Sequence, residues 1–165
     1  LDQGCRNIMH ITHGLNRSAY HQRYVGYKKA MDEVTLFKKE NLLVLDQFNS
    51  REIDSVIAKI TASPEPIDGL FVTNDTFAVY CIKALLKAGY RIPDDIKIIG
   101  FNNDPVSEVI NPELSTIEYP GYRMGVLAGQ SILSHLNGSI NIESADQILL
   151  KHQLIIRQSS RKTTN

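Results

Sequence analysis

The sequence predicts an α/β protein with a Rossmann-like parallel sheet flanked by helices. Patterns typical of a strand and then of a helix alternate four times along the 165 residues. The strand-like runs are short and apolar throughout, as expected when helices cover both faces of a parallel sheet. A hydrophobic content of 42% is enough to form a core in a chain of this length.

Four apolar runs predict the strands of this sheet: residues 8–12, 42–45, 70–72 and 97–101. Residues 115–117 predict a short extended piece, and residues 148–150 and 154–156 predict two final strands. The polar residues from Gln158 on predict a loose tail.

The segments between the strands have helical periodicity. Residues 19–39 carry a stripe of apolar and aromatic side chains that is expected to pack rather than to bind: Tyr20, Tyr24, Tyr27 and Met31. Ser50 is expected to cap the next helix, which Pro64 and Pro66 stop. Its buried face is formed by Ile53, Val56, Ile57 and Ile60.

Two more helices follow. Asn74 or Asp75 caps the first, which ends at Gly89. Its inward side chains are expected to be Ala78, Cys81, Leu85 and Ala88. Residues 122–136 predict a long amphipathic helix that ends at Asn137-Gly138.

Composition excludes several classes of protein. The 18 basic and 18 acidic residues cancel, so this stretch is not expected to grip DNA by itself. No apolar run approaches the roughly 18 residues of a membrane span. Cys5 and Cys81 lack a zinc-type spacing and are interpreted as two reduced core thiols of a cytoplasmic protein, with a single disulfide as the alternative.

The first residues suggest an interrupted fold. Gly4 stands where a helix would end, just before the first strand. We therefore expect the chain to start inside a fold; a short disordered lead-in is the alternative.

Polar and aromatic residues follow every predicted strand. Ligands of parallel α/β sheets bind outside the carboxyl ends of the strands, so these residues should meet on one rim. The candidate ligand-binding residues are Arg17, Arg23, Phe48, Asn74, Asp75 and Asn102. Guanidinium, amide and carboxylate groups suit a ligand with many hydroxyls, and Phe48 could lie against a sugar ring or a purine.

Each candidate has a structural alternative. Arg23 could pair with an acidic neighbour on its helix, and Phe48 could fill the core at a strand end. Asn74 and Asp75 could be helix caps, with Asp75 the better cap and Asn74 the better contact. Asn103 and Asp104 are expected to shape the turn before Pro105.

No catalytic or cofactor site is evident. There is no glycine-rich phosphate cradle, no nucleophile beside a base, and no cofactor motif. His10 and His13 are three residues apart on a strand, point to opposite faces, and make a poor metal pair. The sequence thus favours a binding protein over an enzyme.

Three stretches resemble the effector-binding core of LacI/GalR-family transcriptional regulators. They are RYVGYKKAM (23–31), IDGLFVTNDTFAVYCIKALLKAGYRIPDDIKIIGFNNDP (67–105) and INPELSTIEYPGYRMGVLAGQSIL (110–133), in the family's order. The resemblance runs from about Leu1 to Arg157. It implies a fold like type I periplasmic binding proteins, with two Rossmann-like subdomains and a small effector, a sugar or a related metabolite, in the cleft between them.

The resemblance also implies a division of the chain. Residues 1–114 are expected to form the C-terminal effector-binding subdomain. Residues 115–146 would contain a hinge crossing and a helix of the N-terminal subdomain, 147–157 the return strands, and 158–165 the tail. The helix-turn-helix of the family is absent from this sequence, so operator DNA would be bound through that missing N-terminal domain.

Further roles follow from the resemblance. The effector contacts of the family map onto the rim residues, with Arg23 as the arginine of RYVGY. Asn102 departs from the family, because most members have aspartate there; Ala19 stands where members often have a hydroxyl. A homodimer is implied, with Val79, Val109 and Ile110 near the interface. A sugar-type periplasmic solute-binding protein is the alternative, and no membrane partner is expected.

Overall fold

A computed structural model describes residues 1–142 and 148–161. The chain forms two compact units, described separately below. Unit 1 consists of Leu1–Ile117 with Leu154–Asn165, and unit 2 consists of Glu118–Gln153. Unit 1 contains all the candidate ligand-binding residues.

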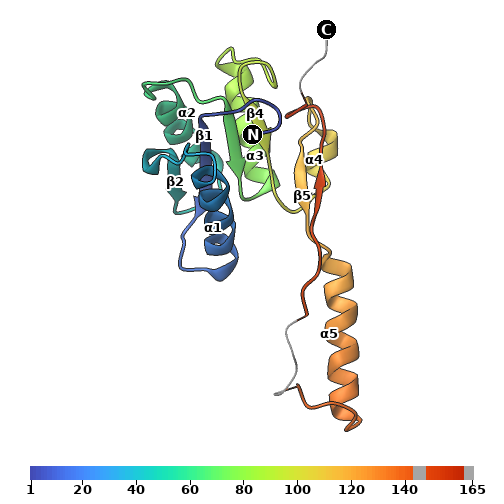
Figure 1. Cartoon of the computed structure of the whole chain (residues 1–165). Coiled ribbons are helices and arrows are strands. Elements are labelled where there is room, and N and C mark those ends of the chain that lie inside the picture. Colours follow the sequence, from blue (N-terminus) through green and yellow to red (C-terminus); the bar gives the residue numbers. More distant parts are fainter. Residues whose placement is uncertain (143–147, 162–165) are drawn as a thin grey trace. The chain divides into compact units, whose positions relative to one another are not determined.

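The core of unit 1 is a four-stranded parallel sheet, which confirms the predicted fold class. Its strands are β1 (Ile8–His13), β2 (Leu42–Leu45), β3 (Gly69–Val72) and β4 (Lys97–Ile99), in the spatial order β2-β1-β3-β4 (Figure 1). Ile8 is in register with Gly69, and Gly69 with Lys97. The carboxyl ends of all four strands therefore meet at one edge, as the sequence predicts.

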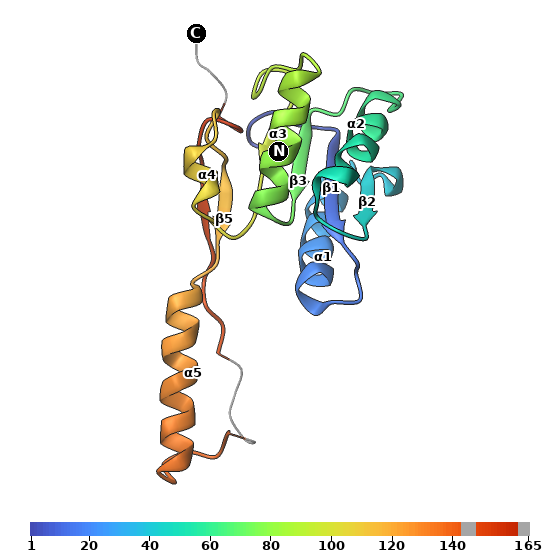
Figure 2. The ribbon, with the colours of Figure 1, turned by 180° about the vertical axis from the view of Figure 1, so that it is seen from behind.

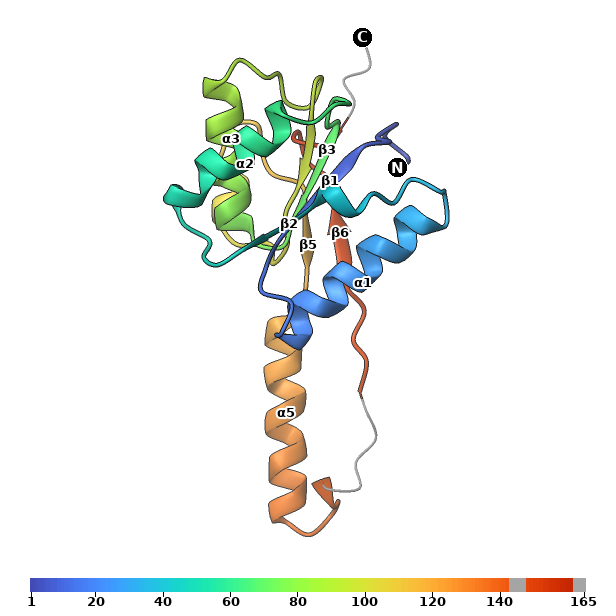
Figure 3. The same cartoon turned by 90° about the vertical axis from the view of Figure 1, so that its left-hand side faces the viewer.

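Helices cover both faces of this sheet. Helix α1 (Ser18–Asp32) lies on one face, and α2 (Ile53–Thr61) and α3 (Asp75–Lys87) lie on the other (Figure 3). Figure 2 shows α2 beside α3 over the sheet. Short 3-10 turns, η1 (Lys39–Asn41) and η2 (Ser50–Glu52), precede β2 and α2.

Alternation along β1 explains how both faces are filled. Met9 and Ile11 belong to the main apolar cluster, which includes residues of α2 and α3. His10 points the other way and is stacked between rings of Tyr27 and Phe71. Tyr27 and Met31 of the predicted α1 stripe are buried, in agreement with a packing role.

Three predicted helix details are wrong, for local reasons. Helix α1 ends at Asp32 rather than near residue 39, because Thr35 has a φ of 60° and Leu36 N donates to Met31 O. Asn49, not Ser50, accepts from Arg51 N at the start of η2. Ala88 is exposed, because α3 already ends at Lys87.

Both cysteines confirm the predicted core thiols. Cys5 and Cys81 are buried and free, so the disulfide alternative is wrong. Complete burial of Cys81 raises the pKa of its thiol to about 12, because an apolar environment disfavours the thiolate.

The chain leaves the main sheet after β4. The fourth strand ends at Ile99 rather than Phe101, because Gly100 N donates to Ser115 O instead of extending the β3 pairing. A short helix, α4 (Val106–Val109), follows. Strands β5 (Thr116–Glu118) and β6 (Gln153–Ile155) then form a separate two-stranded sheet.

The prediction of a loose tail is wrong for the residues after Arg157 that the structure describes. Ser159 is fully buried. Its backbone oxygen accepts from Ile98 N at 2.9 Å, and its hydroxyl donates to Ile98 O at 2.6 Å. Ser115 N donates to the same hydroxyl at 2.8 Å. The segment therefore continues the edge of the sheet beside β4.

Unit 2 is built around α5 (Gly121–Leu136), which agrees closely with the predicted helix at 122–136. None of its residues is buried. Residues 148–150 form no strand, and Leu149 is 80% exposed, so an apolar run alone was not enough to predict pairing there. Residues 143–147, which include the predicted boundary at 146, and tail residues 162–165 lie outside the described residues.

Candidate ligand-binding site

Arg23 lies at the carboxyl-end rim of the sheet. Its position in the second turn of α1 lets the side chain reach the residue that follows β3, where Nη1 donates to Thr73 O at 2.9 Å. The guanidinium carbon lies 3.7 Å from the centroid of the Phe101 ring and 5.5 Å from that of Tyr20. Both aromatic rings attract the cation, so these contacts hold the planar guanidinium of Arg23 in place.

An aromatic corner adjoins this arginine. His13, the last residue of β1, stacks on Tyr20 with ring centroids 5.6 Å apart. Phe48 meets both rings edge-on, at 5.7 Å from His13 and 6.1 Å from Tyr20. Phe48 also stacks on Phe77 of the core at 5.0 Å. It is half-buried and therefore joins the core to the rim.

Hydrogen bonding defines the His13 tautomer in this corner. The Gly14 backbone N–H donates to His13 Nδ1 at 2.6 Å, so Nδ1 is the accepting nitrogen. In the neutral ring Nε2 then carries the proton. His13 thus offers the rim a hydrogen-bond donor.

The cap of α3 is Asn74, not Asp75 as the sequence predicts. Asn74 Oδ1 accepts from Phe77 N at 2.9 Å and caps α3. Its amide NH2 group is the part that suits a ligand. Asp75 is fully buried, so it is not a ligand contact in this structure.

The Asp75 carboxylate instead anchors the loop after β4. It accepts from Thr116 Oγ1 at 2.7 Å and from Asp104 N at 2.8 Å. Burial raises its pKa above the ordinary value, while these hydrogen bonds act in the opposite direction. The backbone of Gly100 lies so close that a Cβ there would overlap Asp75 Oδ1.

Asn102 sits in this anchored loop. It has a φ of 128°, its backbone N donates to Ile117 O at 2.9 Å, and Nδ2 donates to Asp104 Oδ2 at 3.2 Å. Asn103 has a φ of 60°, and its N donates to Thr116 Oγ1 at 3.3 Å. Asn103 and Asp104 shape the turn, as expected from the sequence.

The remaining predicted residues are placed as follows. Arg17 is exposed in the loop between β1 and α1, and Ala19 is exposed in the first turn of α1. Of the predicted dimer residues, Val109 is 81% exposed but Val79 is 6% exposed in the core. Val79 therefore has little surface to offer a partner.

Sequence reasoning missed several rim groups. His13 was considered only as a metal ligand, and Tyr20 only as packing. The spacing of Tyr20 and Arg23, three residues apart on α1, could have placed them on one face. Thr73 contributes through its backbone, which no side-chain pattern reveals.

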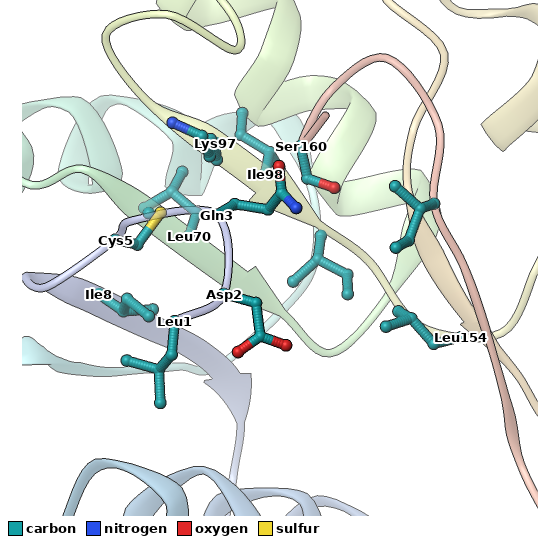
Figure 4. A pocket seen from close by; sticks show the side chains of 13 residues that line it. Leu1, Asp2, Gln3, Cys5, Ile8, Leu70, Lys97, Ile98, Leu154 and Ser160 are labelled. Carbon is teal, nitrogen blue, oxygen red and sulfur yellow. The ribbon is translucent and has the colours of Figure 1, made fainter. Parts of the chain in front are cut away.

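A cavity of about 230 Å³ lies at the opposite end of the strands (Figure 4). Its walls include Ile8, Gly69 and Lys97, the first residues of β1, β3 and β4. Leu1, Leu70 and Ile98 make it mainly apolar. No aromatic residue among those that the structure describes lines it, so it lacks the paired rings of the rim and is not the candidate site.

Metal sites and membrane-spanning helices are both absent from residues 1–142 and 148–161. No group of three or more His, Cys, Asp or Glu side chains there is arranged to hold a metal ion. No helix in those ranges is long and apolar enough to cross a bilayer.

The parallel sheet, with helices on both faces, defines an α/β domain of the Rossmann-like kind. Residues 1–160 match the family described as periplasmic binding protein-like domain. The chain belongs to this family, in the form found in LacI-type transcriptional regulators, which confirms the resemblance.

Two relatives illustrate the match. The ribose operon repressor of Halalkalibacterium halodurans is 31% identical over 136 residues, which are 82% of this chain and 40% of that protein. The transcriptional repressor PurR of Vibrio atlanticus is 27% identical over 165 residues, all of this chain and 48% of that protein. The chain therefore spans less than half the length of these relatives.

Solved structures agree. A LacI family regulator from Lactobacillus casei, with bound sucrose, has a TM-score of 0.77 and 25% identity, covering 96% of this chain and 58% of that chain. A complex of the regulator CelR with cellobiose has a TM-score of 0.85 and 18% identity, covering 96% and 48%. The second likeness shows the fold alone.

Proposed function

We propose that this chain is the effector-sensing part of a LacI-type transcriptional regulator and binds a small polyhydroxylated ligand at the rim of unit 1. The observation that carries this proposal is the placement of Arg23. Its guanidinium is held between Phe101 and Tyr20 and bonded to Thr73 O, where the strand ends meet. A fork fixed in this way is prepared to donate to two neighbouring ligand oxygens.

A sugar or a related metabolite suits the other rim groups. Phe48 and His13 provide apolar ring surface beside hydrogen-bonding groups, a combination that fits a sugar ring with its C–H face and its hydroxyls. The regulator from Lactobacillus casei was solved with bound sucrose, which supports this ligand class. Arg17, Asn74 and Asn102 are proposed as further contacts.

Asn102 is expected to set this effector apart from those of most family members. Its side chain is uncharged and already donates to Asp104 Oδ2. It can therefore accept a ligand hydrogen bond through one amide oxygen, where an aspartate would present a charged acceptor. We infer that Asn102 favours strongly hydrogen-bond-donating ligand groups less than an aspartate at this position would.

Regulation would follow from unequal affinity of the effector for two conformational states of the complete protein. Operator DNA would be bound by a helix-turn-helix elsewhere in that protein, in the cytoplasm. A homodimer would present two such modules to two half-sites. The exposed Val109, with the neighbouring Ile110, is the proposed dimer contact.

A sugar-type periplasmic solute-binding protein is the second candidate function, because it has the same fold and rim. The relatives reported above are named as repressors, which favours the regulator. The same names favour a binding protein over an enzyme.

The proposal is tested by sugar binding to the complete protein. Thermal shift with sucrose, cellobiose, ribose and related sugars identifies a ligand, and calorimetry gives its Kd. Arg23→Ala should raise Kd about 10- to 100-fold, the range for losing a hydrogen bond from a charged group. Arg23→Lys should recover only part of the affinity, because an ammonium lacks the fork.

Arg51→Ala is the matched control, since Arg51 is exposed in η2, in the segment between β2 and α2. It should leave Kd unchanged. A sugar that binds wild type and Arg23→Ala equally well would contradict the proposed site. Absence of binding by the whole panel would contradict the proposed ligand class.

A further inference from the structure

The loop Phe101–Asp104 has a backbone that its sequence does not favour. Asn102 and Asn103 have φ values of 128° and 60°, in the region that favours glycine. Asparagine tolerates the left-handed region better than most residues, but a φ of 128° is strained. Such a conformation persists only when surrounding contacts enforce it.

Arg157 supplies contacts of this kind from one side. Its side chain is only 10% exposed. Nη2 donates to Asn103 Oδ1 at 3.0 Å and to Glu108 Oε1 at 2.8 Å. Nη1 donates to Leu114 O at 2.9 Å and to Ser107 Oγ at 3.2 Å. One guanidinium thus ties Asn103 to α4 and to the segment before β5.

The backbone of Arg157 is fixed as well. Its N donates to Ser115 Oγ at 2.8 Å, and that hydroxyl donates to Arg157 O at 3.1 Å. Buried Ser159 binds the sheet edge two residues later. The backbone from which the guanidinium projects is therefore tied to Ser115 and, two residues on, to β4.

A second charged residue holds the loop from the other side. The Asp75 carboxylate accepts from Asp104 N, and Asn102 N donates to Ile117 O. Asn103 is thus held through its side chain by Arg157, while its two neighbours are held through their backbones. Phe101, at the start of the loop, supports the Arg23 guanidinium at 3.7 Å.

We propose that Arg157 is a positioning residue that fixes the loop Phe101–Asp104 and so presents Asn102 and the Phe101–Arg23 pair to the effector. This role rests on the ligand-binding function proposed for the rim. Arg157 does not touch the ligand; it acts through Asn103. A residue 54 positions from Asn103 in the sequence thereby controls the geometry of the site.

The first test needs no ligand. Hydrogen–deuterium exchange of the complete protein is compared for wild type, Arg157→Met and Arg157→Lys. Arg157→Met should raise the exchange rate of amides 102–104 at least tenfold while β1 and β3 keep theirs; Arg157→Lys should fall between. Arg161→Met is the matched control, because Arg161 is exposed in the same segment. It should leave the loop unchanged.

A double-mutant cycle separates positioning from general stability. Asn103→Gly keeps the left-handed backbone but removes the acceptor of Arg157 Nη2. If Arg157 acts through Asn103, the double variant should show less loop exchange than the two single effects combined. Unchanged loop exchange in Arg157→Met would overturn the proposal, and so would a uniform increase across the sheet.

The binding arm uses sucrose and cellobiose. Where one of them binds wild type, Arg157→Met should raise Kd at least tenfold under conditions in which the variant remains folded. An unchanged Kd would refute the positioning role while leaving the Arg23 site intact. If neither sugar binds wild type, the exchange experiment still decides the role of Arg157, and the full sugar panel decides the ligand class.

Discussion

Acidification should destabilise the protein through His10. The His10 ring is fully buried and lies between Tyr27 and Phe71, with centroids 4.9 Å and 4.8 Å away. Nδ1 lies 3.2 Å from Phe71 O, so it carries the proton of the neutral ring. Among the described residues, Nε2 is the one buried side-chain polar atom without a hydrogen-bond partner.

The expected magnitude follows from the pKa of His10. Burial lowers this pKa from 6.5 to about 4, and the nearby Arg23 cation acts in the same direction. As the pH falls, the unfolded chain therefore takes up a proton before the folded protein does. The stabilising effect is complete above pH 6.5 and is lost as the pH falls towards 4. A pKa difference of about 2.5 corresponds to about 3 kcal/mol.

Urea unfolding of the complete protein at several pH values between 7.5 and 4 measures this effect. His10→Phe keeps a ring in the stack but cannot titrate, so other histidines and carboxylates contribute equally to both curves. Wild type should lose about 3 kcal/mol more than His10→Phe over this range. Parallel curves for the two proteins would refute the reasoning.

Two further predictions concern packing and assembly. Gly100→Ala should lower the free energy of unfolding by about 1–3 kcal/mol, because the new Cβ overlaps Asp75 Oδ1 and crowds Leu114. Gly26→Ala, which has open space around it, is the control and should be neutral or stabilising; equal effects of the two changes would argue against the overlap. Val109→Lys should raise the dissociation constant of the proposed dimer in sedimentation at least tenfold, because a charge would replace an apolar contact in both copies of the proposed twofold interface. Val34→Lys, also at an exposed valine, should leave it unchanged, and a Val109→Lys protein that stays dimeric would contradict the proposed contact.

The sheet was predictable because its strands are continuous apolar runs. Residues 42–45 were assigned without error, and β1 and β3 within one residue, since burial on both faces leaves little ambiguity in hydropathy. The run 148–150 is equally apolar but forms no strand, because pairing needs a partner that composition does not reveal.

The sequence predicted which loops carry the candidate site residues, although their ligand-binding role stays a prediction. Arg23 could be placed because the strand ends must meet and the RYVGY motif resembles the family. The prediction of Asp75 as the better cap was wrong, because both residue types cap helices equally well and the sequence alone does not separate them. Arg157 and Ser159 were missed because hydropathy predicts guanidinium and hydroxyl groups to be exposed. In the structure both side chains are largely buried and their polar groups are hydrogen-bonded.

The bond between Ser159 and Ile98 has a consequence for synthesis on the ribosome. Residues 98 and 159 are 61 apart in the chain, yet the edge of the sheet is complete only when both are in place. Domains generally fold as units when their residues have left the exit tunnel. Unit 1 must therefore wait for the whole of unit 2 to be made, and β4 is left with an open edge during that interval. An open strand edge is a site for mispairing, so nascent chains that stall before Arg157 should be targets for chaperones.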